Sequence, residues 1–273
     1  MKNLVSFLKK IWLTFVFIGF SSAHAGVYED FFVAVRNDND RAVRQLLARG
    51  FDPNTLDPQR RPALVLAVTE ASIKVAQLLL SSPQTDPNLL NSAGESALMM
   101  ASIKGHDELA RQLIARGGDV NKPGWTPLHY AATGGHVQIV RLLLEHHAYV
   151  DAESPNGTTP LMMAAQYGST AALKLLLEEG AQPEQTNERG LKALDFARLG
   201  SRPDAIALLS ALAKKPSAPS PVPSPQVQPA AAPVFPRPAP ESKPAVQVAP
   251  QAAPPAVPPA APKPEAARPT GTW

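Results

Sequence analysis

A leucine followed three residues later by an alanine recurs along this chain at a nearly constant spacing. The pairs are Leu64 with Ala67, Leu98 with Ala101, Leu128 with Ala131, Leu161 with Ala164 and Leu194 with Ala197, and Phe31 with Ala34 extends the series toward the N-terminus. A second apolar block follows each pair, and turn residues such as Gly105, Gly135 and Gly168 separate the two blocks. Each repeat is therefore predicted to be two short helices. One such unit cannot bury its apolar face alone, so the pattern predicts an all-α solenoid of stacked units.

The most specific motif lies in the fourth repeat. Residues 125–132 read Trp-Thr-Pro-Leu-His-Tyr-Ala-Ala, and Gly135, His136 and an aliphatic run at 140–144 follow. This segment resembles the ankyrin repeat consensus, and Thr-Pro-Leu at 159–161 repeats its centre. The resemblance extends over 27–215 and implies an ankyrin-repeat solenoid of six helix-turn-helix repeats. Their approximate bounds are 27–59, 60–93, 94–123, 124–156, 157–189 and 190–215.

The repeats depart from the family pattern in a few places. The link at 121–124 is short by three residues, which predicts a clipped hairpin finger between the third and fourth repeats, and segment 81–86 is one residue longer. The ends of the array are more polar than its middle. Asp38, Asp40 and Arg41 at one end and Arg198, Arg202 and Asp204 at the other are predicted to face water as polar caps.

The first 25 residues have the three parts of a signal peptide. Residues 1–10 are basic, 11–20 are apolar, and the segment ends in Ala23-His24-Ala25. The alternative is an uncleaved membrane anchor, but an apolar run of about ten residues is half of what a bilayer-spanning helix needs. We expect cleavage after Ala25, no integral membrane segment in the mature chain, and a periplasmic location, with a eukaryotic secretory compartment as the alternative.

The last 58 residues, 216–273, hold 19 of the 30 prolines and little that could form a core. This composition predicts a disordered proline-rich and alanine-rich tail that favours an extended conformation. Two interpretations stay open at this stage. The tail is either a solvated spacer, or a ligand or wall-spanning tether with Trp273 as its end anchor.

Charge and cysteine content exclude several classes of function. Without the leader and the tail, the foldable segment holds 19 basic and 21 acidic residues, which is no footprint for a nucleic acid. The chain has no cysteine, so it has no disulfides, thiol nucleophiles or thiolate metal sites. We also find no Ser-His-Asp arrangement or phosphate loop, and we expect neither a catalytic site nor a cofactor.

Five histidines lie in the third and fourth repeats, yet their spacing does not predict a metal site. The resemblance implies that His129 hydrogen-bonds within and between repeats, and that His106 and His136 follow turn glycines for structural reasons. His146 and His147 are adjacent at the end of a helix. Their side chains point about 100° apart, so they are poorly placed to chelate one ion.

The resemblance places a protein partner on the concave face, which is formed by the finger tips and the exposed side of each first helix. Trp125 is the main candidate anchor, because a solvent-facing indole beside a clipped finger calls for a partner; alternatively the clipped loop folds the indole onto its own repeat. Tyr167, Ile103 and Leu191 would extend an apolar stripe with a charged rim. The candidate partner-binding residues are Arg61, Glu70, Glu95, Ile103, Lys104, Trp125, Thr133, Thr158, Gln166, Tyr167 and Leu191.

These observations favour a non-enzymatic, monomeric scaffold that binds a protein partner in the periplasm or secretory space. Some bacterial members of the family support an oxidative-stress enzyme, so an immunity or support factor for a periplasmic enzyme is one alternative. A second alternative is an envelope spacer that acts through the tail. An enzyme or metal carrier is the remaining hypothesis of a different class.

Overall fold

The computed structural model describes residues 26–214. Within this range the regular secondary structure is helical, and the one β-type pairing is an isolated bridge between Leu56 and Pro62. Residues 1–25 and 215–273 lie outside the described residues. The signal peptide and the disordered tail therefore stay predictions.

The helices form six consecutive pairs. A helix over 26–36 pairs with α2 (Asp40–Ala48). The other pairs are α3 (Ala63–Thr69) with α4 (Ile73–Ser81), α5 (Ala97–Lys104) with α6 (Asp107–Ala115), α7 (Pro127–Gly134) with α8 (Val137–Glu145), α9 (Pro160–Gln166) with α10 (Thr170–Glu178), and α11 (Ala193–Leu199) with α12 (Pro203–Lys214). This arrangement confirms the predicted all-α solenoid of six helix-turn-helix repeats.

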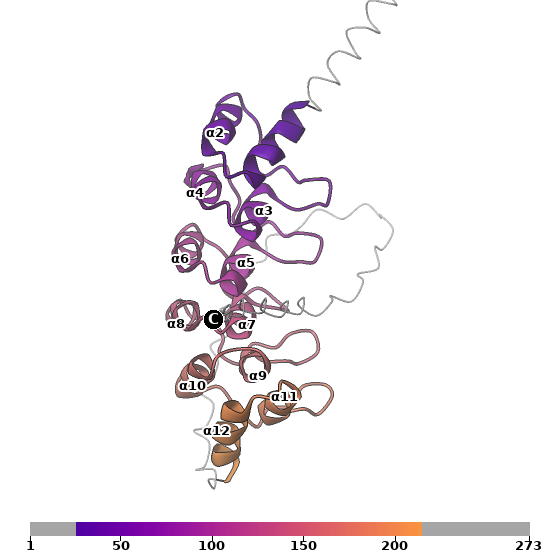
Figure 1. The fold of residues 1–273 in the computed structure, drawn as a ribbon, viewed down its shortest axis with the longest axis vertical. Coiled ribbons are helices and arrows are strands. Elements are labelled where there is room, and N and C mark those ends of the chain that lie inside the picture. The colour runs from indigo at the N-terminus through magenta and orange to yellow at the C-terminus, as the bar shows by residue number, and fades with distance from the viewer. Residues whose placement is uncertain (1–25, 215–273) are drawn as a thin grey trace, which may run out of the picture.

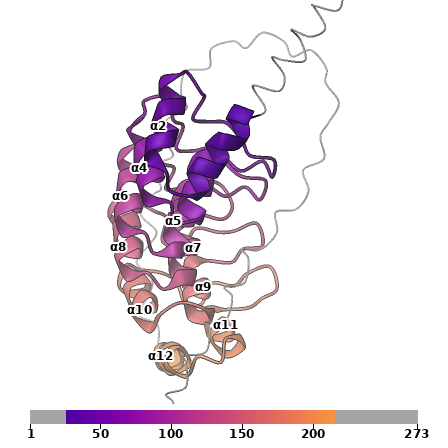
Figure 2. The same ribbon diagram turned by 45° about the horizontal axis from the view of Figure 1, so that its top comes forward.

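The pairs stack in two columns (Figure 1). The inner column runs from α3 through α5, α7 and α9 to α11, and the outer column from α2 through the even-numbered helices to α12. From α2 onward, each helix packs against its counterpart in the next repeat. The connecting loops project as a row of fingers on the side away from the outer column, as the rotated view in Figure 2 also shows. Most of the predicted leucines and alanines are buried between these layers, and Leu98, Ala101, Leu128 and Ala131 are fully buried; Leu194 in the last repeat is only partly buried.

Short-range contacts define the ends of several inner helices. Thr159 Oγ accepts a hydrogen bond from the backbone N–H of Met162 (3.4 Å), and Pro160 occupies the first turn of α9, where no backbone donor is needed. Gly105 and Gly135 close α5 and α7 with φ of +75° and +70°, which the absence of a side chain makes favourable. These local signals mark the start of α9 and the ends of α5 and α7.

The link between the third and fourth repeats is short, as expected. Residues 116–126 join α6 to α7, three residues fewer than the 49–62 link between α2 and α3. The 82–96 link between α4 and α5 is one residue longer than that reference. Both predicted departures from the regular finger length are confirmed.

A ladder of side-chain amides joins the bases of neighbouring fingers. Asn88 Nδ2 donates to the carbonyl of Gly117 (2.9 Å), and its Oδ1 accepts from the backbone N–H of Asp119 (2.8 Å). Asn54 and Asn121 bridge to the next repeat in the same way. Each asparagine therefore pairs one donor and one acceptor of the following repeat, always two residues apart.

The fourth member of the ladder is a carboxylate. Asp151 Oδ1 accepts from the backbone N–H of Gln182 (3.0 Å), but an ionised carboxylate has no N–H for the carbonyl of Gly180, which lies two residues before Gln182. Burial raises the pKa of Asp151, and the nearby Glu153 adds to the rise, although the hydrogen bond from Gln182 opposes it. The hydrogen bonding at Asp151 is therefore weaker at neutral pH than the hydrogen bonding at the three asparagines of the ladder.

Asp151→Asn is expected to raise the free energy of unfolding by about 1 kcal/mol at neutral pH, because the amide supplies the missing donor and removes a half-buried charge. The pKa of Asp151 is raised in the folded state, so the penalty of the carboxylate grows as pH rises and disappears in acid. Urea unfolding at pH 7 and at pH 3.5 measures this difference.

The matched control is Asn121→Asp. It should lower stability at pH 7 and recover in acid. An Asp151→Asn protein that is no more stable than the parent at pH 7 would show that the ladder contributes nothing at this position.

Candidate functional site

The structure divides the eleven predicted face residues into three groups. Glu70, Lys104 and Tyr167 are exposed, while Arg61, Ile103, Gln166 and Leu191 are partly buried. The remaining four, Glu95, Trp125, Thr133 and Thr158, are buried. Their buried side chains offer a partner almost no surface.

Trp125 is the main correction. Its side chain is only 6% exposed and packs with its ring edge against His129, with the ring centroids 5.1 Å apart. The predicted exposed anchor is therefore wrong, and the alternative, an indole folded onto its own repeat, is what the structure shows. Lys122 closes the short link by donating to the backbone carbonyls of Pro123 (3.2 Å) and Trp125 (3.4 Å). With three residues fewer in the finger, the indole lies against the repeat.

Glu95 was expected on the charged rim, and this expectation is also wrong. The residue is 9% exposed, and its carboxylate accepts from Tyr130 Oη (2.9 Å) in the next repeat and from Asn91 Nδ2 (2.8 Å). Burial and the adjacent Glu95 carboxylate raise the pKa of Tyr130, so its hydroxyl stays a donor. Glu95 thus fastens the third repeat to the fourth.

His129 explains why the threonines beside it are buried. Its Nδ1 accepts from the backbone N–H of Thr126 (3.2 Å), which assigns the proton to Nε2, and Nε2 donates to the carbonyl of Thr158 in the next repeat (2.8 Å). Thr133 Oγ donates to the His129 carbonyl (2.7 Å). The predicted hydrogen bonds of His129 within and between repeats are confirmed. Burial lowers its pKa to about 4, so the ring is neutral at physiological pH.

We expect the stability of the protein to fall as pH drops from 6.5 toward 4. In this window the unfolded chain binds a proton at His129 and the folded chain does not, so folding becomes less favourable by up to about 3 kcal/mol. His129→Met should flatten the fall, because Met99 and Met162 stand at the same position in neighbouring repeats and their sulfurs accept the same backbone N–H.

The measurement is thermal unfolding between pH 7 and pH 4. His129→Met should lose about 1 kcal/mol at pH 7, since the Thr158 carbonyl loses its donor. If the two proteins lose stability in parallel on acidification, His129 is not the titrating group.

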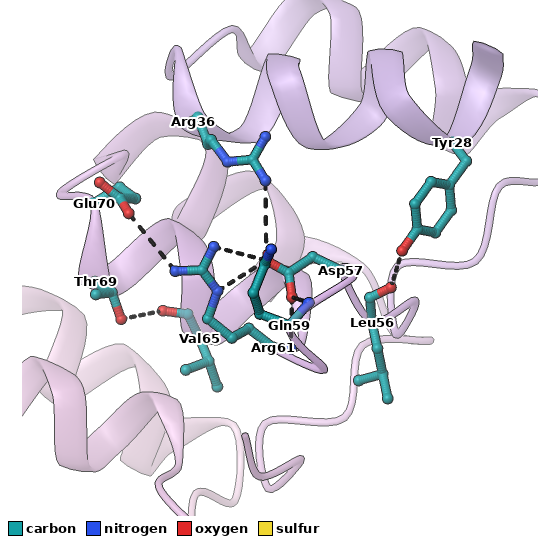
Figure 3. Close-up of polar contacts among 9 residues, drawn as sticks. All are labelled: Tyr28, Arg36, Leu56, Asp57, Gln59, Arg61, Val65, Thr69 and Glu70. Atoms are coloured by element: carbon teal, nitrogen blue, oxygen red, sulfur yellow. Dashed lines mark hydrogen bonds and ion pairs between the residues drawn. The ribbon is translucent and has the colours of Figure 1, made fainter. Parts of the chain in front are cut away.

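The N-terminal end of the concave face is charged (Figure 3). Asp57 is buried in the turn of the first finger, and its Oδ2 lies 2.7 Å from Arg61 Nη2 and 4.0 Å from Arg36 Nη2. Its Oδ1 accepts from the backbone N–H groups of Gln59 (3.0 Å) and Arg61 (2.8 Å). Glu70 approaches Arg61 from the other side, at 4.0 Å. Asp57 therefore fixes the finger turn and orients Arg61 at the surface.

The C-terminal end of the same face is apolar. Tyr167 is 46% exposed at the end of α9, and Leu199 is 62% exposed at the end of α11. Leu199 was missing from the predicted set, which named Tyr167 and Leu191 at this end, and its neighbours Arg198 and Arg202 were predicted to form a polar cap. The spacing of the repeats could have predicted it. Leu199 stands five residues after Leu194, just as Ile103, which was in the predicted set, stands five after Leu98. The face thus has two chemically different ends.

We also searched residues 26–214 for metal-binding clusters and membrane-spanning helices. Among residues 26–214, no three histidine, aspartate or glutamate side chains gather as metal ligands would. His146 and His147 are exposed at the end of α8. None of the helices described combines the length and apolar content that crossing a bilayer requires.

Comparison with known proteins agrees with this geometry. The family model described as "Ankyrin repeats (3 copies)" matches residues 31–123, 74–154, 118–187 and 149–218. The mouse ankyrin repeat and SAM domain-containing protein 6 is 44% identical over 109 residues, which are 38% of this chain and 12% of that protein. The mouse B-cell lymphoma 3 protein homolog is 33% identical over 123 residues, 42% of this chain and 28% of that protein.

Among solved structures, the human ASB11 ankyrin repeat domain superposes with a TM-score of 0.60 at 25% identity, covering 66% of this chain and 82% of that chain. The curated relatives above are matched over well under a third of their own lengths. The similarity is therefore to their repeat regions. Because overlapping matches to the family model extend from 31 to 218, the chain belongs to the ankyrin repeat family.

Proposed function

We propose that this protein is a non-enzymatic scaffold that binds a protein partner on its concave face, in the periplasm or another secretory space. Membership of the ankyrin repeat family supports a role in protein–protein interaction. The partner's identity is not carried over from the relatives, because the match is confined to their repeats.

One observation carries the proposal. The positions that pack between repeats are nearly uniform, as the buried Leu98, Leu128 and Leu161 show. The position five residues further on, at the edge of the concave face, differs in chemistry from repeat to repeat. In chain order it is occupied by Arg36, Thr69, Ile103, Thr133, Gln166 and Leu199. A uniform frame with a varied surface is what a binding face for one particular partner requires.

The test uses the exported chain, residues 26–273, as bait in an extract of its own compartment, followed by affinity measurement on each captured protein. Tyr167→Ala and Glu70→Ala remove one exposed side chain from each end of the face. Each should weaken binding by about tenfold or more if it is a central contact. Trp125 is unsuitable as a probe, because its truncation would damage the core.

Tyr149→Ala is the matched control. Tyr149 is 68% exposed but follows the outer helix α8, away from the concave face. If Tyr149→Ala weakens binding and the two face variants do not, the partner binds elsewhere and the proposed face is wrong.

The proposed location rests on the leader of the sequence. We expect the exported protein to begin at Gly26, because the A-x-A segment ends at Ala25. N-terminal sequencing of protein recovered from the periplasm of a bacterial host measures this directly. Recovery of the chain with Met1 in place, in the cytoplasmic fraction, would contradict both the cleavage and the location.

A further inference from the structure

The last repeat carries an apolar depression at the C-terminal end of the stack, beside the edge of the concave face where Leu199 lies. It is lined by Arg189, Leu191, Asp195, Arg198 and Leu199, and we call it the terminal depression. Leu191 enters from the last finger and Leu199 from the end of α11. The end repeat of a solenoid usually presents a polar surface to water. An open leucine-lined depression at this position therefore points to an occupant.

The apolar surface continues onto the preceding repeat. Helices α9 and α11 pack side by side, and the backbone of Gly200 is so close to Gln166 that a Cβ atom on Gly200 would lie 2.3 Å from the Gln166 carbonyl oxygen. Tyr167 follows Gln166 and is 46% exposed, so an exposed aromatic residue ends α9 close to the turn that follows Leu199. An aromatic ring beside leucines is the kind of surface on which proline-rich segments dock.

The charges around the terminal depression nearly cancel. Arg198 Nη1 pairs with Asp195 Oδ1 at 3.2 Å, which leaves Arg189 as the remaining charge among the lining residues. A strongly acidic peptide would gain from Arg189 but would approach Asp195 at a cost. An uncharged segment meets no such opposition. The site therefore favours an uncharged apolar occupant that accepts hydrogen bonds from arginine.

The chain itself contains such a segment. Residues 216–236 include no charged side chain and eight prolines. Proline has no backbone N–H, so a segment rich in proline presents carbonyl acceptors with few donors. Arginine is the complementary group, because its guanidinium only donates. The proline rings and Phe235 match the leucines and Tyr167 in polarity.

The segment also begins within reach of the terminal depression. Helix α12 ends at Lys214 and has 12 residues, so its length is roughly 18 Å. About six residues of extended proline-rich chain would cover the distance back along it, and 21 residues would span roughly 65 Å. A tethered ligand also experiences a millimolar effective concentration, so that even a weak contact is populated.

We propose that residues 216–236 dock within the same molecule on the terminal depression, with prolines on Leu191 and Leu199 and their carbonyls facing Arg189. The docked segment covers the C-terminal end of the concave face and competes with anything that binds there. This inference does not depend on the proposed function, since it requires no outside partner and its test includes none.

The absence of cysteine permits a direct experiment. A spin label is attached through Ser224→Cys in the chain 26–273, and paramagnetic broadening of the Leu191 methyl signals is measured. Leu199→Ser and, separately, Arg189→Ala should each lower the ratio of docked to free segment, the former by about tenfold, because a leucine contact is lost. Leu90→Ser is the matched control, since Leu90 is 43% exposed on another finger.

Two outcomes would overturn the proposal. If broadening at Leu191 is the same in the parent, Leu199→Ser and Arg189→Ala, the label samples the region only because it is tethered. If broadening instead arises between a labelled and an isotope-enriched molecule mixed in equal amounts, the occupant is a second copy. Circular dichroism on each variant checks that its helical content is unchanged, as the exposure of Leu199 leads us to expect.

Discussion

Nearest-neighbour stacking is the interaction on which the whole structure depends. Each helix pair is too small to bury its own apolar face, and the layer between two pairs is filled by residues such as Leu128 and Ala131 that are completely shielded from water. Polar contacts then set the register of each layer. His129 donates to Thr158, Tyr130 donates to Glu95, and Asn88 bridges to the following finger. The buried positions are nearly uniform along the chain because the same two helix surfaces pack together at every junction.

The same constraint explains which parts of the fold could be predicted from sequence. Periodic leucine and alanine, the turn glycines and the short third link predicted the six helix pairs and the clipped finger. The family resemblance predicted the bonds of His129. Some backbone conformations could not be predicted from the residue type. Ala71 adopts a φ of +58° at the position where the third and fourth repeats have Gly105 and Gly135. A residue type alone does not reveal that its neighbours hold it in a left-handed conformation.

The face was harder to predict than the frame. The repeat register placed Trp125 and Glu95 at the surface, but both are buried. Trp125 lies against its own repeat because its finger is three residues shorter, and Glu95 is buried because it accepts a hydrogen bond from Tyr130 in the next repeat. The burial of Glu95 depends on Tyr130, which lies 35 positions further on, and a pattern within one repeat does not contain such a contact. Leu199 was overlooked for the opposite reason. It lies beside residues whose charges predicted a polar cap, although its own register placed it on the face.

The carboxylate at position 151 has a consequence for how the array comes apart. In a linear stack, the junction with the poorest coupling is where cooperativity breaks first. Three successive junctions are joined by an amide that both donates and accepts, and the one after the fourth helix pair is joined by a group that only accepts. Among these four contacts the weakest lies between α8 and α10, a junction that His129 and Gln185 also join through Thr158 and Glu153. An opening at this junction would release the two last helix pairs together, and with them Tyr167, Leu191 and Leu199, while the charged end of the face stays in the other part.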